Sequence, residues 1–472
     1  MIPITEYARR DVAVFGLGRT GLSAAKALEA GGARVHAWDD NEETREKAEA
    51  AGLMLSDINK RDWQTFAALV LSPGVPYKFP QPHRIVRMAE MTGVPVVGDM
   101  ELFARAVQAL PERGRPKVVG ITGTNGKSTT TALIGHILKE AGRDARVGGN
   151  IGKGVLDMAP LHANAVYVLE LSSYQLDLVK SLHCDIGVFL NLSPDHLDRH
   201  GGVDGYIAAK KRIFLNQTQK DYAIVGVDDL QSQALSMSLS SKGQSRVIQV
   251  SSEYALGRGV SAVQGTLYDS LMGKATPVGG LDAAQALPGR HNHQNAAAAY
   301  ATCRVLGIEP NVILNAIRSF PGLPHRLEMV GRVHGVKFIN DSKATNAQAA
   351  EQALKAFRNV YWIAGGRSKF DGIGELAPYF SRITKAYLIG EAQDAFAESL
   401  KDKAEAVKCG TLENAVQEAL RDAREAGEPD PIILLSPACA SFDQFKDFEA
   451  RGDAFRLIVE KLMGEHTELE SA

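Results

Sequence analysis

The chain has 472 residues, of which 45% are hydrophobic and 23% are charged, and its formal charge at pH 7 is −2. Its composition is that of an ordinary globular protein, and its length predicts about three domains. The balanced charge excludes a basic footprint for nucleic acid, and no apolar run approaches the ~20 residues of a membrane span. Residues 1–15 lack a secretory signal, and the four widely spaced cysteines suit a reducing cytosol. We therefore expect a cytoplasmic protein.

The first ~110 residues predict a βαβ unit with a glycine-rich turn. A buried strand over 12–15 leads into Gly-Leu-Gly-Arg-Thr-Gly at 16–21, and a second strand over 34–38 ends at Asp39 and Asp40. Read alone, this is a dinucleotide fingerprint for NAD or FAD, but such a match is weak. A third strand over 67–71 ends in Ser-Pro-Gly-Val-Pro at 72–76. That segment is either a ligand-binding strand end or a simple turn.

The second domain begins on a phosphate-binding loop. Residues 108–117 gain Pro, Gly and charge and predict a linker, and a buried strand then leads into Gly-Thr-Asn-Gly-Lys-Ser at 123–128 and a helix. Helix N-terminal N–H groups bind phosphate, Lys127 supplies a cation, and Ser128 can ligate Mg²⁺. Ile121 stands where the common P-loop has its first glycine, so the loop is a variant. The alternative is a chance Gly-Lys-Ser in an ordinary turn.

Polar side chains follow the next strands of this domain. A strand over 165–169 delivers Glu170, which is either a Mg²⁺ ligand or a solvated acid. A strand over 186–190 is followed by His196, which is functional, structural or merely exposed. The acids and histidine at 195, 198 and 200 suggest a separate metal cluster, although their spacing matches no known motif. Lys210 lies on an amphipathic helix over 206–214, where it could be a snorkelling surface lysine, and spacing alone does not select it as functional.

Residues 231–285 are Ser- and Gly-rich and predict a peripheral β region. Asn292 and Asn295 then lie three residues apart at the start of an Ala-rich helix. Their side-chain amides either bind the edge of a nucleotide base or cap the helix. Residues 319–324 predict a second linker. A third α/β domain follows, with strands over 337–339, 360–364, 386–389 and 432–435. Polar segments follow three of these strands, at 340–346, 365–369 and 436–443.

Together these motifs resemble the Mur ligases, the ATP-dependent amide-forming enzymes of bacterial cell-wall synthesis. The resemblance covers nearly the whole chain and is carried, in family order, by the 123–128 loop, Glu170, His196, the Asn292/Asn295 helix, Arg326 and Asp341. Three segments, at 16–21, 340–346 and 436–445, resemble the branch that joins D-glutamate to UDP-N-acetylmuramoyl-L-alanine. The chain has no Asp-Asn-Pro-Arg segment of the kind used by the enzyme that adds a diamino acid.

The resemblance implies three α/β domains: a Rossmann-like UDP-substrate domain over 1–112, a central P-loop ATPase-like domain over 113–322, and a Rossmann-like amino-acid-binding domain over 323–472. It implies UDP-substrate contacts at Gly18, Arg19, Thr20, Asp39, Asp40, Gly74 and Asn150. The implied ATP contacts are Gly123, Thr124, Asn125, Gly126, Lys127, Ser128, Thr129, Asn292, Asn295, Arg326 and Asp341. The implied D-glutamate contacts are Lys343, Thr345, Lys369, Ser441 and Phe442. The chain departs from the usual family pattern at Asp40-Asn41 and at Arg367-Ser368, which lies beside Lys369.

The implied mechanism activates the L-alanine carboxylate as an acyl phosphate, which the D-glutamate amine then attacks after domain closure. Lys127, His196 and Lys210 are the implied catalytic residues. Two Mg²⁺ ions are expected, one on Ser128 and Glu170, the other on His196 and a carbamylated Lys210. The expected partners are ATP, UDP-N-acetylmuramoyl-L-alanine and D-glutamate, with a monomeric chain, no nucleic acid and no membrane insertion.

Three competing interpretations remain. A nicotinamide oxidoreductase using the 16–21 loop leaves the phosphate loop unexplained. A non-catalytic nucleotide switch has no need of Lys343 or the 436–444 segment. Folylpolyglutamate synthase is a relative with the same ATP loop, but it lacks an N-terminal nucleotide domain like residues 1–110.

Overall fold

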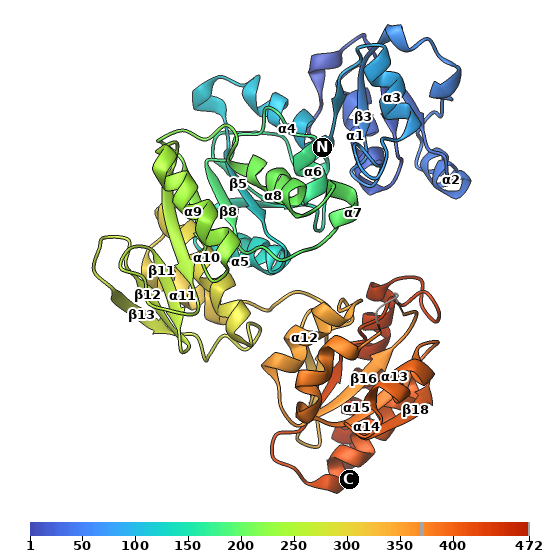
Figure 1. Cartoon of the computed structure of the whole chain (residues 1–472), viewed down its shortest axis with the longest axis vertical. Helices are drawn as coiled ribbons and strands as arrows, with labels where there is room; N and C mark the ends of the chain where they lie inside the picture. Colours follow the sequence, from blue (N-terminus) through green and yellow to red (C-terminus); the bar gives the residue numbers. More distant parts are fainter. Residues whose placement is uncertain (369–371, 471–472) are drawn as a thin grey trace. The chain divides into compact units, whose positions relative to one another are not determined.

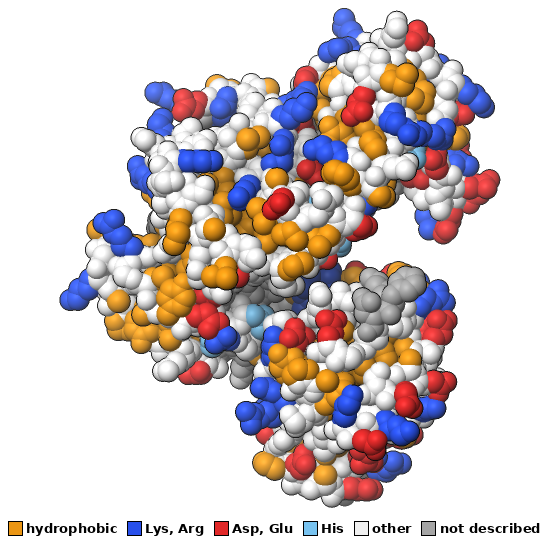
Figure 2. All heavy atoms as spheres, viewed as in Figure 1, with side chains coloured by type: hydrophobic (Ala, Val, Ile, Leu, Met, Phe, Trp, Pro, Cys, Tyr) orange, Lys and Arg blue, Asp and Glu red, His pale blue; other side chains and the backbone are white. Residues whose placement is uncertain are grey.

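The computed structural model describes residues 1–368 and 372–470. The chain forms two compact units (Figure 1). The first comprises Met1–Ala283 and His293–Ser319, and the second comprises Ala284–Asn292 and Phe320–Ala472. On the face of each unit seen in Figure 2, acidic and basic side chains are interspersed, as the near-zero net charge leads one to expect.

The first unit opens with the predicted βαβ unit, within a four-stranded parallel sheet of order β2-β1-β3-β4. The side chains of β1 and β3 are almost all buried, as both faces of a parallel sheet are covered. Its strands are β1 (Asp11–Phe15), β2 (Arg34–Trp38), β3 (Phe66–Leu71) and β4 (Val96–Val97). Its helices are η1 (Thr5–Tyr7), α1 (Arg19–Ala30), α2 (Glu42–Ala50), η2 (Ile58–Lys60), η3 (Trp63–Thr65) and α3 (Arg84–Met91).

Helix α4 (Asp99–Gln108) connects this sheet to the next and is held against the segment that follows α6 of the central region. The buried carboxylate of Glu101 accepts hydrogen bonds from the backbone amides of Lys180 (2.7 Å) and Ser181 (2.8 Å) and from Arg105 Nε (2.9 Å). A buried carboxylate with this many donors is well compensated, and these donors hold its pKa below the ordinary value despite desolvation. The predicted linker over 108–117 thus begins where α4 ends and includes η4 (Glu112–Gly114).

The central sheet of the first unit has nine strands in the order β13-β12-β11-β10-β9-β8-β5-β7-β6. They are parallel except for the antiparallel pairs at β11, β12 and β13. The strands are β5 (Lys117–Thr122), β6 (Asp144–Gly149), β7 (Ala165–Glu170), β8 (Ile186–Phe189), β9 (Tyr222–Gly226), β10 (Arg246–Ser251), β11 (Val260–Val263), β12 (Thr266–Asp269) and β13 (Thr276–Gly280). The helices are α5 (Lys127–Glu140), η5 (Val155–Asp157), α6 (Ser173–Asp177), α7 (Leu197–His200), α8 (Val203–Lys211), η6 (Arg212–Phe214), α9 (Leu230–Lys242), α10 (Arg290–Val305) and α11 (Pro310–Ser319).

One sequence-based prediction is wrong here. Residues 231–285 were expected to form a peripheral β region, but they begin in helix α9. Asp229 caps this helix by accepting from the Ser232 amide, and Leu235 and Leu239 are buried. Its many serines hide the helical period, because only these few apolar side chains mark the buried face. Strands β10 to β13 follow, as the β prediction requires.

The second unit contains a six-stranded sheet of order β14-β15-β19-β16-β17-β18, in which only β14 is antiparallel to its neighbour. Helices cover both faces and enclose two hydrophobic clusters. The strands are β14 (Glu328–Val333), β15 (Val336–Asn340), β16 (Val360–Gly365), β17 (Ile383–Ile389), β18 (Ala406–Gly410) and β19 (Ile432–Leu435). The helices are α12 (Ala347–Ala356), η7 (Gly374–Arg382), α13 (Gln393–Leu400), α14 (Leu412–Ala426) and α15 (Phe448–Glu470).

Candidate active site

The predicted phosphate loop lies between β5 and α5 and is tightly built. Gly126 caps α5 in a left-handed conformation with φ 82°, which glycine adopts without strain. A Cβ at Gly126 would lie 2.3 Å from Oδ1 of Asn295, so the backbone of the loop packs closely on this predicted ATP contact. Asn191, just after β8, accepts from the Asn125 amide (2.9 Å) through Oδ1 and from the Thr124 amide (3.0 Å) through its carbonyl.

Two lysines converge on this loop. Lys127 Nζ donates to the carbonyls of Gly123 (3.0 Å) and Thr124 (2.7 Å), and Lys210 Nζ donates to the same Gly123 carbonyl (2.7 Å). Lys210 is only 1% exposed, and its Nζ lies 4.7 Å from the centre of the Tyr206 ring. Burial, and next the charge of Lys127, lower the pKa of Lys210 well below its ordinary value. The interpretation of Lys210 as a snorkelling surface lysine is therefore wrong, because its whole side chain, head group included, is enclosed.

Glu170 ends strand β7 and is 3% exposed, so it is not the solvated acid that the sequence left open. Its Oε1 accepts from Asn150 Nδ2 at 2.8 Å. Its Oε2 is buried and has no hydrogen-bond partner among the described residues. An unpartnered buried carboxylate oxygen is costly unless a cation meets it, which is the chemistry of a hard-metal ligand.

His196 lies at the start of α7, also in a left-handed backbone conformation, with φ 51°. Partial burial lowers its pKa; the Asp195 carboxylate opposes this, and the charges of Lys127 and Lys210 add to it. These electrostatic contacts place the three predicted catalytic side chains in one neighbourhood.

The suggested metal cluster at 195, 198 and 200 does not form. His200 is buried, with Nε2 2.9 Å from Ser173 Oγ and Nδ1 3.1 Å from Asp177 Oδ2, so its ring nitrogens face α6. Within the part of the chain that the structure describes, no three His, Cys, Asp or Glu side chains are grouped to hold a metal. A cation at the phosphate loop would therefore need other ligands as well, such as the Ser128 hydroxyl or a modified lysine.

The predicted UDP-substrate residues lie along the carboxyl ends of β1 to β3 and at the facing end of β6. Asp39 Oδ2 accepts from the Leu17 amide (2.7 Å), and the Thr20 hydroxyl lies 3.2 Å from that of Ser72. Arg19 donates to the carbonyls of Asn150 (3.0 Å) and Gly152 (2.8 Å), which links the first sheet to the second.

Asp40 and Gly74 face other partners. Asp40 pairs with Arg84 (2.9 Å) and His83 (3.3 Å) at the start of α3. The Gly74 carbonyl accepts from Arg199 Nη1 (3.1 Å). Asp40 thus contacts α3, and Gly74 contacts Arg199 of α7.

The predicted residues of the second unit follow strands β15 and β19. Asp341 is buried, accepts from Ser436 Oγ (2.8 Å) and the Leu327 amide (3.3 Å), and burial raises its pKa to about 7. The charge of Arg326 partly opposes this rise. Asn292 belongs to this unit, whereas Asn295 belongs to the first, and Asn292 Nδ2 donates locally to the Pro288 carbonyl (2.8 Å).

One aromatic residue outside the predicted D-glutamate contacts lies beside Lys343. Lys343 Nζ lies 4.5 Å from the centre of the Phe448 ring, whereas the predicted Phe442 is 62% exposed. Phe448 lies three residues beyond the 436–445 segment used for the resemblance, and no sequence pattern singled it out. Ser441 is buried, and the Thr345 amide donates to the Lys343 carbonyl (2.8 Å). Lys369 lies outside the described residues.

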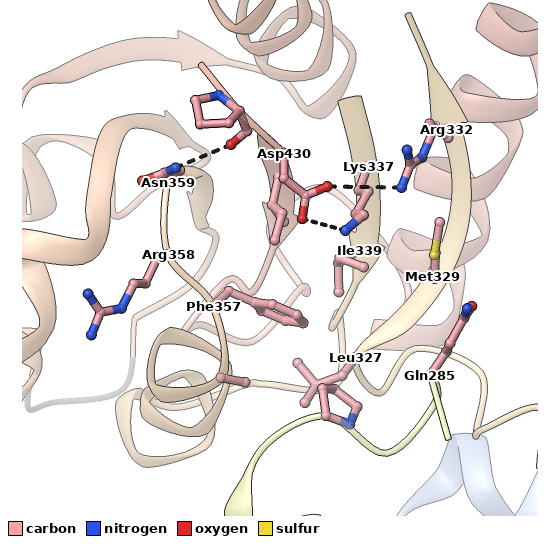
Figure 3. Close-up of a pocket in the computed structure, with 14 residues that line it drawn as sticks. Gln285, Leu327, Met329, Arg332, Lys337, Ile339, Phe357, Arg358, Asn359 and Asp430 are labelled. Carbon is pink, nitrogen blue, oxygen red and sulfur yellow. Dashed lines mark hydrogen bonds and ion pairs between the residues drawn. The ribbon is translucent and has the colours of Figure 1, made fainter. Parts of the chain in front are cut away.

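A cavity of about 490 Å³ in the second unit is lined by none of the predicted site residues (Figure 3). It opens at the amino ends of β15, β16 and β19, where Lys337 meets Asp430 at 2.6 Å. Ligands of open α/β sheets bind at the carboxyl ends, where the predicted residues lie. The lining residues are Gln285, Pro288, Leu327, Met329, Arg332, Lys337, Ile339, Ala356, Phe357, Arg358, Asn359, Pro429, Asp430 and Ile432.

Comparison with known proteins decides the family. Family models match residues 10–98 (Mur ligase MurD-like, N-terminal domain), 121–303 (Mur ligase middle domain) and 325–439 (Mur ligase, glutamate ligase domain). The chain belongs to the Mur ligase family. Two relatives named UDP-N-acetylmuramoylalanine--D-glutamate ligase, from Caulobacter vibrioides and Phenylobacterium zucineum, are each 57% identical over 98% of both chains. A third, from Rhodospirillum rubrum, is 49% identical over 98% of this chain and 97% of its own.

Solved Mur ligases share the fold at low identity. UDP-N-acetylmuramate-alanine ligase MurC from Thermotoga maritima aligns with a TM-score of 0.57 at 17% identity, covering 97% of this chain and 99% of its own. MurF from Acinetobacter baumannii aligns with a TM-score of 0.56 at 16% identity, covering 99% and 93%. The Mur ligase chain is thus a mixed α/β protein with the N-terminal, middle and C-terminal domains of its family. Within residues 1–368 and 372–470, none of its helices has the length and apolar character needed to span a bilayer.

Proposed function

We propose that this Mur ligase joins D-glutamate to UDP-N-acetylmuramoyl-L-alanine with hydrolysis of ATP to ADP and phosphate, in the cytoplasmic stage of peptidoglycan synthesis. The observation that carries the proposal is the 57% identity, over 98% of both chains, to relatives named for that reaction. The proposal also includes domain boundaries after residues 112 and 322 and a monomeric chain.

The reaction needs cations because a carboxylate is a poor electrophile. Its oxygen attacks the γ-phosphorus of ATP to form an acyl phosphate, and the D-glutamate amine then displaces phosphate through a tetrahedral intermediate. Negative charge develops on phosphate oxygens in both steps, and fixed cations stabilise it. Lys127, held over the loop by two carbonyls, is positioned to meet the outer phosphates.

Ser128 and Glu170 fit a Mg²⁺ ion, because the Oε2 of Glu170 is buried without a hydrogen-bond partner. When bound, the ion would neutralise charge on the phosphates of ATP. We further propose a second Mg²⁺ ligated by His196 and by Lys210 as a carbamate. Its support is that burial favours the neutral amine of Lys210, and only a neutral amine captures CO₂.

The remaining ATP and D-glutamate contacts are also proposals. We propose Gly123, Thr124, Asn125, Gly126, Thr129, Asn292, Asn295, Arg326 and Asp341 as further ATP contacts. We propose Lys343, Thr345, Lys369, Ser441 and Phe442 as D-glutamate contacts.

Amino-acid selectivity tests the proposed function directly. We expect ADP release with UDP-N-acetylmuramoyl-L-alanine to be far faster with D-glutamate than with L-glutamate, L-alanine or diaminopimelate. The measurement is a coupled ADP assay, with the UDP substrate omitted as the blank. Equal or faster turnover with diaminopimelate would assign the chain to another step of the pathway.

The 16–21 loop is tested by Gly18→Val. Gly18 has φ −61°, and a Cβ there meets no atom within 4 Å, so the fold tolerates a side chain. If the backbone of this loop approaches the UDP moiety, valine blocks that approach. We expect the KM for the UDP substrate to rise at least about tenfold, roughly the effect of losing one good contact, while the KM for ATP stays unchanged.

Gly21→Val is the matched structural control. A Cβ at Gly21 would lie 1.7 Å from the Gly16 carbonyl oxygen, so this variant loses thermal stability as well as activity. Calorimetry of the wild type with NAD addresses the oxidoreductase alternative. Tight NAD binding without binding of the UDP substrate would overturn the assignment of the loop.

A further inference from the structure

Helix α7 begins after His196 and contacts, through Arg199, the predicted UDP-substrate residue Gly74. It is only four residues long, yet it is firmly held, because His200 at its end is buried and contacts both Ser173 and Asp177 of α6. His196 stands at its other end in a left-handed conformation, which a non-glycine residue keeps only when its surroundings impose it. The orientation of His196 therefore depends on what packs against α7.

The first sheet contacts this region through the segment that follows β3. Arg199 of α7 donates from Nη1 to the Gly74 carbonyl (3.1 Å) and from Nη2 to the Pro73 carbonyl (3.5 Å). Lys78 of the same segment lies 3.9 Å from the Asp177 carboxylate that holds His200. Both contacts join the segment after β3, which includes the predicted UDP-substrate residue Gly74, to α7 and to the α6 residue that contacts His200.

The Tyr174 ring completes the connection. The Arg199 guanidinium lies 4.7 Å from the centre of this ring, in a cation–π arrangement. The same ring lies 5.1 Å from the His196 ring and 5.5 Å from the His200 ring, with an interplanar angle of 18° to the latter. The Tyr174 ring therefore lies against both Arg199 and His196.

We propose that Arg199 and Tyr174 are positioning residues that couple occupation of the UDP-substrate pocket at Pro73–Gly74 to the orientation of His196 at the phosphate loop. The inference rests on the proposed function, because that function assigns the UDP substrate to the Gly74 loop and catalysis to His196. With the UDP moiety bound, the loop carbonyls fix Arg199, Arg199 fixes the Tyr174 ring, and the ring fixes the imidazole. The consequence is that acyl phosphate formation proceeds efficiently only when the nucleotide end of the substrate is seated.

The test is a double-mutant cycle between Arg199→Met and Tyr174→Leu. Methionine keeps an unbranched apolar side chain but removes the guanidinium that donates to both carbonyls and lies against the ring. We expect Arg199→Met to raise the KM for the UDP substrate and also to lower kcat by about tenfold or more, because small misplacements of catalytic groups cost up to ~10² in rate. The KM values for ATP and D-glutamate should stay within about threefold, a range that we treat as unchanged.

Coupling predicts that the two substitutions are not additive. The double variant should lose about as much kcat/KM as the worse single variant, since either change already breaks the connection. Tyr174→Phe keeps the ring and should retain near-normal kcat, which a role for the hydroxyl would not allow. Arg143→Met is the matched control, since Arg143 is an exposed arginine of the same unit, just after α5, and should change no parameter.

Several outcomes overturn the inference. An Arg199→Met variant with a raised KM but normal kcat would show that Arg199 serves only the UDP loop. Multiplicative losses in the double variant would show two independent roles. If Arg199→Met fails to fold, Arg199→Lys, which keeps the charge but loses the two-carbonyl fork, replaces it with the same expectations. Absence of D-glutamate turnover in the wild type would instead contradict the proposed function, so the two failures are distinguishable.

Discussion

Replacing Lys210 by alanine is expected to abolish most ligase activity without destabilising the fold. If the carbamate of Lys210 holds a Mg²⁺ near the acyl phosphate, its loss removes charge stabilisation and should lower kcat by about 10²- to 10³-fold. Thermal stability should change little, because the loss of an unfavourably buried polar group offsets the cavity that the truncation leaves. Lys127 still donates to the Gly123 carbonyl, so the loop keeps a donor there. Steady-state kinetics and thermal unfolding measure the two effects separately.

The chain supplies an internal control for this experiment. Lys211 is the next residue on α8 and is exposed. Because successive residues of a helix are rotated by about 100°, its side chain points away from the loop. Lys211→Ala should stay active. A small added carboxylic acid should partly restore Lys210→Ala by taking the vacated ligand position, and should not affect the wild type. Near-normal rates in Lys210→Ala, or an inactive Lys211→Ala, would mean that the wrong lysine was assigned.

Replacing Lys127 by alanine is expected to lower kcat by about 10²- to 10³-fold, the usual effect of losing one donor to developing charge. The affinity for the UDP substrate should not change, because Lys127 donates to the Gly123 and Thr124 carbonyls of the phosphate loop, and the predicted UDP-substrate residues lie elsewhere. Rapid-quench measurement of acyl phosphate formation, together with calorimetric titration of the UDP substrate, separates these effects.

Lys139→Ala is the matched control for Lys127→Ala. Lys139 is an exposed lysine at the far end of the same helix, α5, so its removal changes the net charge equally without touching the loop. It should retain full activity. Activity of Lys127→Ala within a few-fold of wild type would show that the loop is structural and would favour the chance Gly-Lys-Ser interpretation.

Local patterns predicted the elements that carry the candidate site. The strand–glycine–helix transitions at 12–21 and 118–131 are confirmed as β1 to α1 and β5 to α5, because a buried strand, a left-handed glycine and a helix start each leave a signature within a few residues. Strands β7, β8, β15, β16 and β19 were found for the same reason. The order of these motifs along the chain also sufficed to recognise the family.

The environment of individual side chains was decided only by the tertiary structure. The sequence placed Lys210 on an amphipathic helix, but periodicity reports which residues share a face and not what that face meets. Its buried Nζ donates to the Gly123 carbonyl, 87 residues earlier, a contact that only the fold creates. The same holds for His200, which was considered as part of a metal cluster but contacts α6 instead, and for Phe448, which contacts Lys343 across more than a hundred residues. Contacts between distant segments depend on how the sheets pack, so spacing along the chain could not supply them.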